Sequence, residues 1–221
     1  MEIKKQLITL NFTKGGNKKK YIVVHDTGNK TDTAAGNAKY FQTKRESSAH
    51  YFVDDKEIIQ LVLDEDKAWH AGKPVGDICN SNSIGIEMCR VNDEVTAITE
   101  EKTLWLVKEL MAKHKIPVEN VVRHFDASGK NCPSAFSKND WAKWKEFKKK
   151  LGFVEVKEWK RGDKNPEILK LQELLNKKGA LLKPDGDFGG KTELAVVDFQ
   201  TREKLPITKK LDKLTQAKLR A

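Results

Sequence analysis

Short, continuous apolar runs at residues 21–25 and 84–89 constrain the fold of this chain most. The first run, Tyr-Ile-Val-Val-His, predicts a strand buried on both faces, and the second, Ile-Gly-Ile-Glu-Met-Cys, predicts another short strand. Residues 48–62 read as a hairpin, while residues 33–42 and 100–114 have the apolar spacing of helices. Strands that alternate with helices predict the α/β class, with a central mixed β-sheet flanked by helices.

A change of pattern at residues 151–163 predicts two domains. This segment follows a lysine-rich amphipathic helix at about 140–150 and precedes a new helix start, where Asn165 can cap and Pro166 fits the first turn. The last 58 residues hold three apolar stripes interrupted by turn residues such as Asp-Gly-Asp-Phe-Gly-Gly, which predicts a compact three-helix unit. The expected organisation is a larger domain, a linker and a small helical domain, at 1–150, 151–163 and 164–221.

Charge narrows the classes of partner. Lys and Arg number 42 against 32 Asp and Glu, giving a net charge of +10, which implies attraction to nucleic acid, anionic lipid or an anionic cell-wall polymer. No basic stripe interleaved with aromatic residues supports nucleic-acid binding. No run approaches the roughly 18 apolar residues that cross a membrane. The N-terminal residues also lack the pattern of a secretory signal peptide. We expect no nucleic-acid partner, no membrane insertion and no signal peptide.

Two histidines and one cysteine suggest a metal site. His25 ends one predicted strand, His124 ends another, and Cys132 follows eight residues after His124. Two imidazoles and a thiolate are good zinc ligands, and three protein ligands with a fourth position left for water form the catalytic arrangement. The alternative is that both histidines pack at strand ends and that Cys132 is a buried thiol. The metal interpretation requires the two strands to be neighbours in the sheet.

Glu87 and Lys130 are the candidate catalytic residues. In the strand at 84–89, Glu87 falls on the face opposite Ile84 and Ile86, and a carboxylate in an apolar strand must reach solvent, a partner or a site. Across from a metal, it could take a proton from water and later deliver it to a leaving nitrogen. Lys130 lies between two candidate ligands, where an ammonium could stabilise an oxyanion. An edge-strand carboxylate and a solvated lysine are the alternatives.

Five segments in order resemble one enzyme family. The segments are Val-Val-His-Asp-Thr-Gly, Ser-Ser-Ala-His-Tyr-Phe-Val-Asp, Trp-His-Ala-Gly, Ser-Ile-Gly-Ile-Glu-Met-Cys and Arg-His-Phe-Asp-Ala-Ser-Gly-Lys-Asn-Cys-Pro. Together, from about residue 20 to 137, they resemble the zinc-dependent N-acetylmuramoyl-L-alanine amidases of the type-2 amidase and peptidoglycan-recognition-protein superfamily. The resemblance implies hydrolysis of the amide between N-acetylmuramic acid and L-alanine of peptidoglycan. It also implies that zinc is held by His25, His124 and Cys132, with Glu87 as general base and Lys130 at the oxyanion.

The remaining residues of these motifs receive weaker assignments. Some relatives carry a catalytic tyrosine just before the second histidine, where this chain has Ala49, so the chemistry must depend on Glu87. We expect substrate contacts from His50, His70 and Trp69, although His50 could act behind the ligands and His70 could be a satisfied loop histidine. Residues expected to have no catalytic role are Cys79, Cys89, His114 and Asp126.

The C-terminal residues resemble the type 1 peptidoglycan-binding domain, with Leu-Gln-Glu-Leu-Leu, Asp-Gly-Asp-Phe-Gly-Gly and Asp-Phe-Gln in the usual order. A calcium-binding loop at Asp185 is excluded because Val196 stands where a bidentate glutamate is required. An amidase followed by a wall-binding module resembles a phage endolysin, made in the host cytoplasm and released to the wall. A bacterial or prophage autolysin and a non-catalytic recognition protein are the alternatives. We expect peptidoglycan as partner and a monomer.

Overall fold

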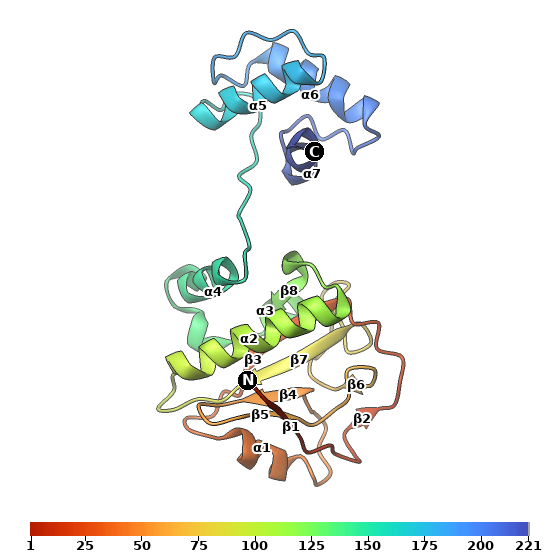
Figure 1. The fold of residues 1–221 in the computed structure, drawn as a ribbon, viewed down its shortest axis with the longest axis vertical. Coiled ribbons are helices and arrows are strands. Elements are labelled where there is room, and N and C mark those ends of the chain that lie inside the picture. Colours follow the sequence, from red (N-terminus) through yellow and green to blue (C-terminus); the bar gives the residue numbers. More distant parts are fainter. Residues whose placement is uncertain (221) are drawn as a thin grey trace. The chain divides into compact units, whose positions relative to one another are not determined.

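The computed structural model describes residues 1–220 and divides the chain into two compact units, Met1–Phe153 and the part that begins at Val154 (Figure 1). The larger unit contains a mixed six-stranded sheet in the order β1-β5-β4-β7-β3-β8. Neighbouring strands in it are parallel, except that β4 and β5 are antiparallel to each other. This confirms the predicted central mixed sheet. The strands are β1 (Ile3–Lys5), β5 (Ile58–Gln60), β4 (Tyr51–Val53), β7 (Ser83–Met88), β3 (Tyr21–Asp26) and β8 (Val121–Arg123).

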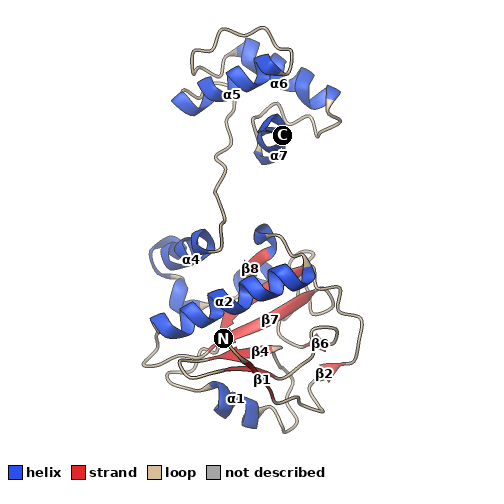
Figure 2. Ribbon diagram, viewed as in Figure 1, coloured by secondary structure: helices blue, strands red, loops and turns tan. Residues whose placement is uncertain are grey.

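Helices cover both faces of this sheet (Figure 2). One face packs against α2 (Ala97–His114) and α4 (Lys138–Lys150), through a core that includes Ile22, Ile86 and Phe147. The other face packs near β4 and β5 against α1 (Ala34–Tyr40). The remaining elements of this unit are short: β2 (Phe12–Thr13), β6 (Lys67–Ala68), η1 (Val118–Asn120), α3 (His124–Ser128) and η2 (Ser134–Phe136).

Strand register decides which side chains share a face. Val24 and Ile86 are partners in the parallel pair of β3 and β7 and belong to the core beneath α2, as do Ile22 and Ile84. Because side chains alternate along a strand, the next pair of partners, His25 and Glu87, points to the opposite face. The face that α2 leaves uncovered therefore carries the candidate chemistry.

The smaller unit consists of α5 (Pro166–Lys177), α6 (Gly190–Arg202) and α7 (Lys213–Arg220) around a core that includes Leu171, Phe188 and Phe199. A buried glutamine on α5, Gln172, holds the neighbouring turn. Its side-chain amide oxygen accepts from the backbone N–H groups of Asp185 and Gly186. On α6, the Gln200 amide donates to the Lys210 carbonyl. These bonds satisfy loop backbone groups that burial would otherwise leave unpaired.

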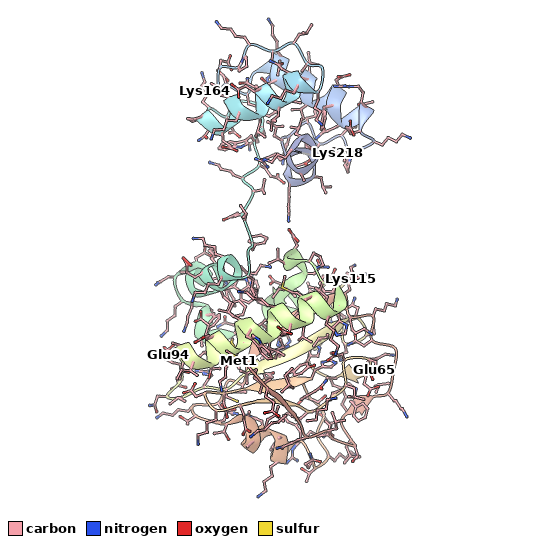
Figure 3. The ribbon with its side chains drawn as sticks, viewed as in Figure 1. Met1, Glu65, Glu94, Lys115, Lys164 and Lys218 are labelled. Carbon is pink, nitrogen blue, oxygen red and sulfur yellow. The ribbon has the colours of Figure 1, made fainter. Side chains whose placement is uncertain are left out.

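Residues within the segment expected as a linker, 151–163, pack in the cores of the two units. Leu151 packs in the core of the larger unit, and Trp159 is buried in the core of the smaller unit, where its backbone bridges to Leu211. Periodicity missed Trp159 because a single aromatic residue in an extended segment has no repeat. Charged side chains such as Glu94 and Lys115 lie on the surface of the larger unit (Figure 3). No helix among residues 1–220 is long and apolar enough to span a bilayer.

The buried carboxylate of Asp64 predicts a stability that depends on pH. It accepts hydrogen bonds from Tyr51 Oη (2.5 Å), Lys113 Nζ (2.7 Å) and His114 Nε2 (2.8 Å), with Asp64 itself 2 % exposed. Burial by itself raises the pKa of Asp64. The hydrogen bonds from these donors together lower the pKa by more than burial raises it, so the folded pKa lies below its ordinary value. The stabilisation is therefore present above the unfolded pKa of about 3.9 and is lost as the pH falls through the folded pKa.

Asp64→Asn should accordingly lower the free energy of unfolding at pH 7 by about 2–4 kcal/mol, because it removes a buried charge and replaces one acceptor oxygen by an NH2 group that faces other donors. The difference from the wild type should narrow below about pH 4. Calorimetric scans at several pH values measure both effects. The control is Asp140→Asn, which removes an exposed ion pair with Lys145 and should change little. An Asp64→Asn difference that is constant with pH would contradict the prediction.

The smaller unit should be sensitive to the loss of one core aromatic. Phe188 is fully buried, and Phe188→Ala should lower the stability of this unit by about 3–5 kcal/mol through lost contacts and a cavity. A unit of this size has a small core, so the change should unfold it near room temperature. The matched control is Leu194→Ala on α6, where the side chain is 70 % exposed. Calorimetry should show the transition of the larger unit unchanged in both variants.

Candidate metal centre and active site

A cavity of about 740 Å³ opens on the face of the sheet opposite α2. Its lining brings together side chains from the ends of β3 and β7, from α1 and α3, and from the loops at 69–72 and 129–132. A cavity of this volume accommodates a small organic ligand or a segment of a polymer. All five candidate metal and catalytic residues border it, namely His25, Glu87, His124, Lys130 and Cys132.

His25, His124 and Cys132 converge at this cavity. One ligand atom from each lies within 4.8 Å of the other two, and all three residues are buried. His25 Nδ1 lies 3.9 Å from Cys132 Sγ, although 107 residues separate them in the chain. The adjacency of β3 and β8 brings the two histidines together, with ring centroids 4.5 Å apart.

The donor set fits a soft or borderline divalent cation. Neither ring nitrogen of His124 makes a well-aligned hydrogen bond, although the Ala71 backbone lies near enough to favour a protonated ring. Burial, followed by the charge of Glu87, raises the pKa of the Cys132 thiol, and a bound cation would favour the thiolate. Two imidazoles and one thiolate that face a cavity suit zinc with an open coordination position. Unpaired ring nitrogens in a buried site are consistent with that use.

Glu87 lies beside this cluster. Its Oε1 is 3.8 Å from His25 Nδ1, its Oε2 is buried without a hydrogen-bond partner, and its side chain is 20 % exposed. Burial raises the pKa of Glu87 well above its ordinary range, Asp26 raises it further, and Lys130 opposes the shift. A carboxylate with one free oxygen at a cavity can exchange a proton with a bound molecule.

Lys130 and Trp69 border the same cavity, and both have room to contact a ligand. Lys130 is exposed at the cavity. Burial is the main cause that lowers the pKa of His124, and the positive charge of Lys130 lowers it further. The indole N–H of Trp69 donates to Thr13 Oγ1 at 3.1 Å, which fixes the ring at the rim. His70 also borders the cavity but turns its Nδ1 toward His25 Nε2, at 3.1 Å.

His50 does not line the cavity, contrary to the expected substrate contact. Its side chain is completely buried, its Nδ1 accepts from the Gly85 backbone N–H at 3.0 Å, and its Nε2 lies 3.1 Å from the Asp66 carbonyl oxygen. Burial lowers the pKa of His50 to about 4, so the ring is neutral and holds β7 against the loop before β6. His50 directly precedes β4, and the sequence does not distinguish a buried histidine from a groove histidine at such a position.

Two acidic residues of the site were missed by the sequence analysis. The buried Asp26 carboxylate accepts from the Ala135 backbone N–H at 2.6 Å and from Ser134 Oγ at 3.2 Å, which anchors the segment directly after Cys132. Asp32 accepts from the side-chain amide of Asn37 at 2.7 Å and fixes the cavity wall. The only available signal for Asp26 was its position directly after His25.

Asp126, expected to be a surface acid, pairs with Arg123.

Comparisons with known proteins agree with this architecture. Residues 15–135 match the N-acetylmuramoyl-L-alanine amidase family, and residues 164–219 match the peptidoglycan binding domain family. The N-acetylmuramoyl-L-alanine amidase XlyA of Bacillus subtilis (strain 168) is 38 % identical over 135 residues, which cover 60 % of this chain and 44 % of XlyA. The chain thus matches less than half the length of this curated relative.

Solved structures resemble the larger unit. A mutant endolysin from Bacillus subtilis is 37 % identical with a TM-score of 0.61, over 69 % of this chain and 99 % of the endolysin chain. The catalytic domain of XlyA is 35 % identical with a TM-score of 0.62, over 69 % of this chain and 100 % of that domain. Because the family match spans more than half of the chain and includes the converging side chains, this protein belongs to the N-acetylmuramoyl-L-alanine amidase family.

Proposed function

We propose that this protein hydrolyses the amide bond between the lactyl group of N-acetylmuramic acid and L-alanine in bacterial peptidoglycan. The observation that carries the proposal is the convergence of His25, His124 and Cys132 at one cavity, with Glu87 beside them. The names of the family and of its relatives supply the bond. The domain at 164–219, by its family, would hold the enzyme on the same polymer and so raise its local concentration there.

Zinc is the proposed cofactor, and His25, His124 and Cys132 would hold it. When bound, zinc supplies a Lewis acid that polarises a carbonyl oxygen and makes water a stronger nucleophile near neutral pH. Two nitrogens and one sulfur are a usual zinc donor set, whereas Mg²⁺ and Ca²⁺ prefer oxygen ligands. The cavity leaves room for water and substrate on the open side of the three ligands.

Glu87 and Lys130 would perform the proton and charge chemistry. The free Oε2 of Glu87 accepts a proton as the oxygen of water attacks the lactyl carbonyl carbon. The Lys130 ammonium stabilises the negative charge that develops on the carbonyl oxygen. The proton held by Glu87 then passes to the alanine nitrogen as the C–N bond breaks, which yields a carboxylic acid and a free amino terminus. Trp69 at the rim would contact the glycan or the peptide.

The test is digestion of purified peptidoglycan followed by mass spectrometry of the fragments. New amino termini on L-alanine should appear with zinc-loaded protein, and treatment with a strong chelator should stop their release until zinc is restored. Release that continues without metal would remove zinc from the mechanism. Wall binding without any new termini would favour a non-catalytic recognition protein instead.

Lys130→Ala should lower turnover by about 10²–10³-fold, as expected when one oxyanion donor is lost. Binding of the protein to intact walls should stay close to wild type, because Lys130 is one of 42 basic residues. Amino-terminus release and a wall pull-down measure the two effects separately. Lys108→Ala, on the exposed side of α2, removes the same charge away from the cavity and should affect neither. Weaker wall binding at unchanged turnover would make Lys130 a binding residue.

We further propose that the protein acts as a phage endolysin that reaches the wall from the host cytoplasm. The similarity to a mutant endolysin from Bacillus subtilis supports this role. A bacterial or prophage autolysin would have the same chemistry. Expression in a Gram-positive host with and without a membrane-permeabilising protein distinguishes them, because an endolysin should lyse the cells only when the membrane is opened.

A further inference from the structure

We propose that His70 is a positioning residue for the metal ligand His25: its Nδ1 accepts the proton on His25 Nε2 and holds the Nδ1 lone pair of His25 toward the metal site. This proposal rests on the zinc site proposed above. The two rings meet edge to face, with His25 Nε2 3.1 Å from His70 Nδ1, ring centroids 5.2 Å apart and an interplanar angle of 87°. Both side chains are buried, so water does not compete for this hydrogen bond.

The direction of the hydrogen bond follows from the far side of His70. His70 Nε2 lies 3.3 Å from Ser83 Oγ, and the Ser83 hydroxyl donates to the Cys79 backbone carbonyl at 2.6 Å. A carbonyl oxygen can only accept, so the Ser83 proton points to Cys79 and a lone pair of Oγ is left to accept from His70 Nε2–H. A neutral His70 with its proton on Nε2 has an acceptor at Nδ1. The proton shared with His25 must then belong to His25 Nε2.

This tautomer is the one that metal binding requires. With its proton on Nε2, His25 presents the lone pair of Nδ1, which lies 3.9 Å from Cys132 Sγ and 3.8 Å from Glu87 Oε1. A metal-bound histidine usually donates its other N–H to a carboxylate, a carbonyl or water, and this partner fixes the ring. Here the acceptor is a second histidine, oriented in turn by Ser83 of β7.

The backbone is built to hold the His70 ring in this place. A Cβ atom at position 85 would lie 2.5 Å from His70 Cγ, so the ring packs on β7 only because residue 85 is glycine. The Asn80 side-chain oxygen accepts from the backbone N–H groups of His70 and Ala71, at 3.0 and 2.8 Å, and fixes the loop that carries the ring. Gly85 was a strand residue without an assigned role in the sequence, and this packing supplies one.

The test compares two substitutions of nearly equal size in the full chain. His70→Leu removes the acceptor, whereas His70→Asn places a carbonyl oxygen near the position of Nδ1. Zinc dissociation constants, from competition with a chromophoric chelator, should rise about 10–100-fold in His70→Leu. His70→Asn should recover most of that loss. His114→Asn changes a histidine on α2 that bonds Asp64 and does not border the cavity, so it should leave zinc affinity unchanged.

A second comparison moves His70 without removing it. Gly85→Ala should displace the ring and weaken zinc binding in the same direction, whereas Gly76→Ala adds a Cβ that meets no atom within 4 Å and should not. In the zinc-loaded wild type, ¹⁵N-detected NMR of the imidazoles should find the proton on Nε2 of both His25 and His70. This measurement does not depend on whether any variant folds.

Three results would overturn the proposal. They are wild-type zinc affinity in folded His70→Leu, equal weakening in folded His70→Leu and His70→Asn, and a proton found on His70 Nδ1 in the wild type. A wild-type chain that binds no zinc gives a different result, because it removes the zinc site itself and with it the proposed amidase mechanism. The failure of the His25 orientation alone is therefore distinguishable from the failure of the proposed function.

Discussion

Cys132→Ser should abolish tight zinc binding and lower amide hydrolysis by about 10³-fold or more, a loss that corresponds to several kcal/mol of transition-state stabilisation. Serine keeps the shape of the side chain but replaces a soft thiolate by a hydroxyl that ionises far less readily. Cys132 is buried beside His25 and His124 and supplies the sulfur of this three-residue cluster. Metal content by elemental analysis and release of alanine amino termini measure the two losses.

The chain offers matched controls for this experiment in its two other cysteines. Cys79 is half-buried, and its sulfur contacts Ser81 Oγ, while Cys89 is buried in the core near α1. Cys79→Ser and Cys89→Ala should therefore keep one zinc per chain and near wild-type turnover of the folded protein. Retention of tight zinc in Cys132→Ser, or its loss in Cys79→Ser, would show that the ligands have been assigned incorrectly.

Glu87→Gln should lower turnover by about 10²–10⁴-fold while zinc binding stays within a few fold of wild type, the range expected when a general base is lost. Glutamine preserves the shape of the side chain but cannot take a proton from water. The variant should also be at least as stable as the wild type, because it removes a carboxylate whose pKa burial raises well above its ordinary range.

Zinc content, thermal unfolding and amino-terminus release should be measured on the same preparation of the Glu87 variant. Glu94→Gln is the control, since Glu94 is exposed and pairs with Lys138 away from the cavity. A wild-type rate in Glu87→Gln would assign the base to another residue. Loss of zinc together with loss of rate would instead make Glu87 a part of the metal site.

Local sequence patterns predicted the central part of the fold. The apolar runs at 21–25 and 84–89 predicted the two central strands, and alternation along the second placed Glu87 on the face opposite Ile84 and Ile86. Those features depend on neighbours within a few residues, so sequence alone reveals them. Trp159 was assigned to a linker because its core partner, Leu211, lies 52 residues further along the chain.

Local sequence patterns did not predict the roles of all the histidines. The motifs indicated His25 and His124 as ligands, but only the structure shows that His50 is a buried support of β7 and that His70 Nδ1 lies beside His25 Nε2. His114 was expected to have no catalytic role, and the structure gives it a partner, the buried Asp64, 50 residues away.

The sequence by itself predicted the α/β class, the two central strands and the residue types available for the chemistry. The tertiary structure alone decided that β3 lies between β7 and β8, and this arrangement brings His25 to Glu87 on one side and near His124 on the other. The physical reason is that strand neighbours are selected by burial of the whole sheet between helices. That energy is summed over residues far apart in the chain and is invisible in any one segment.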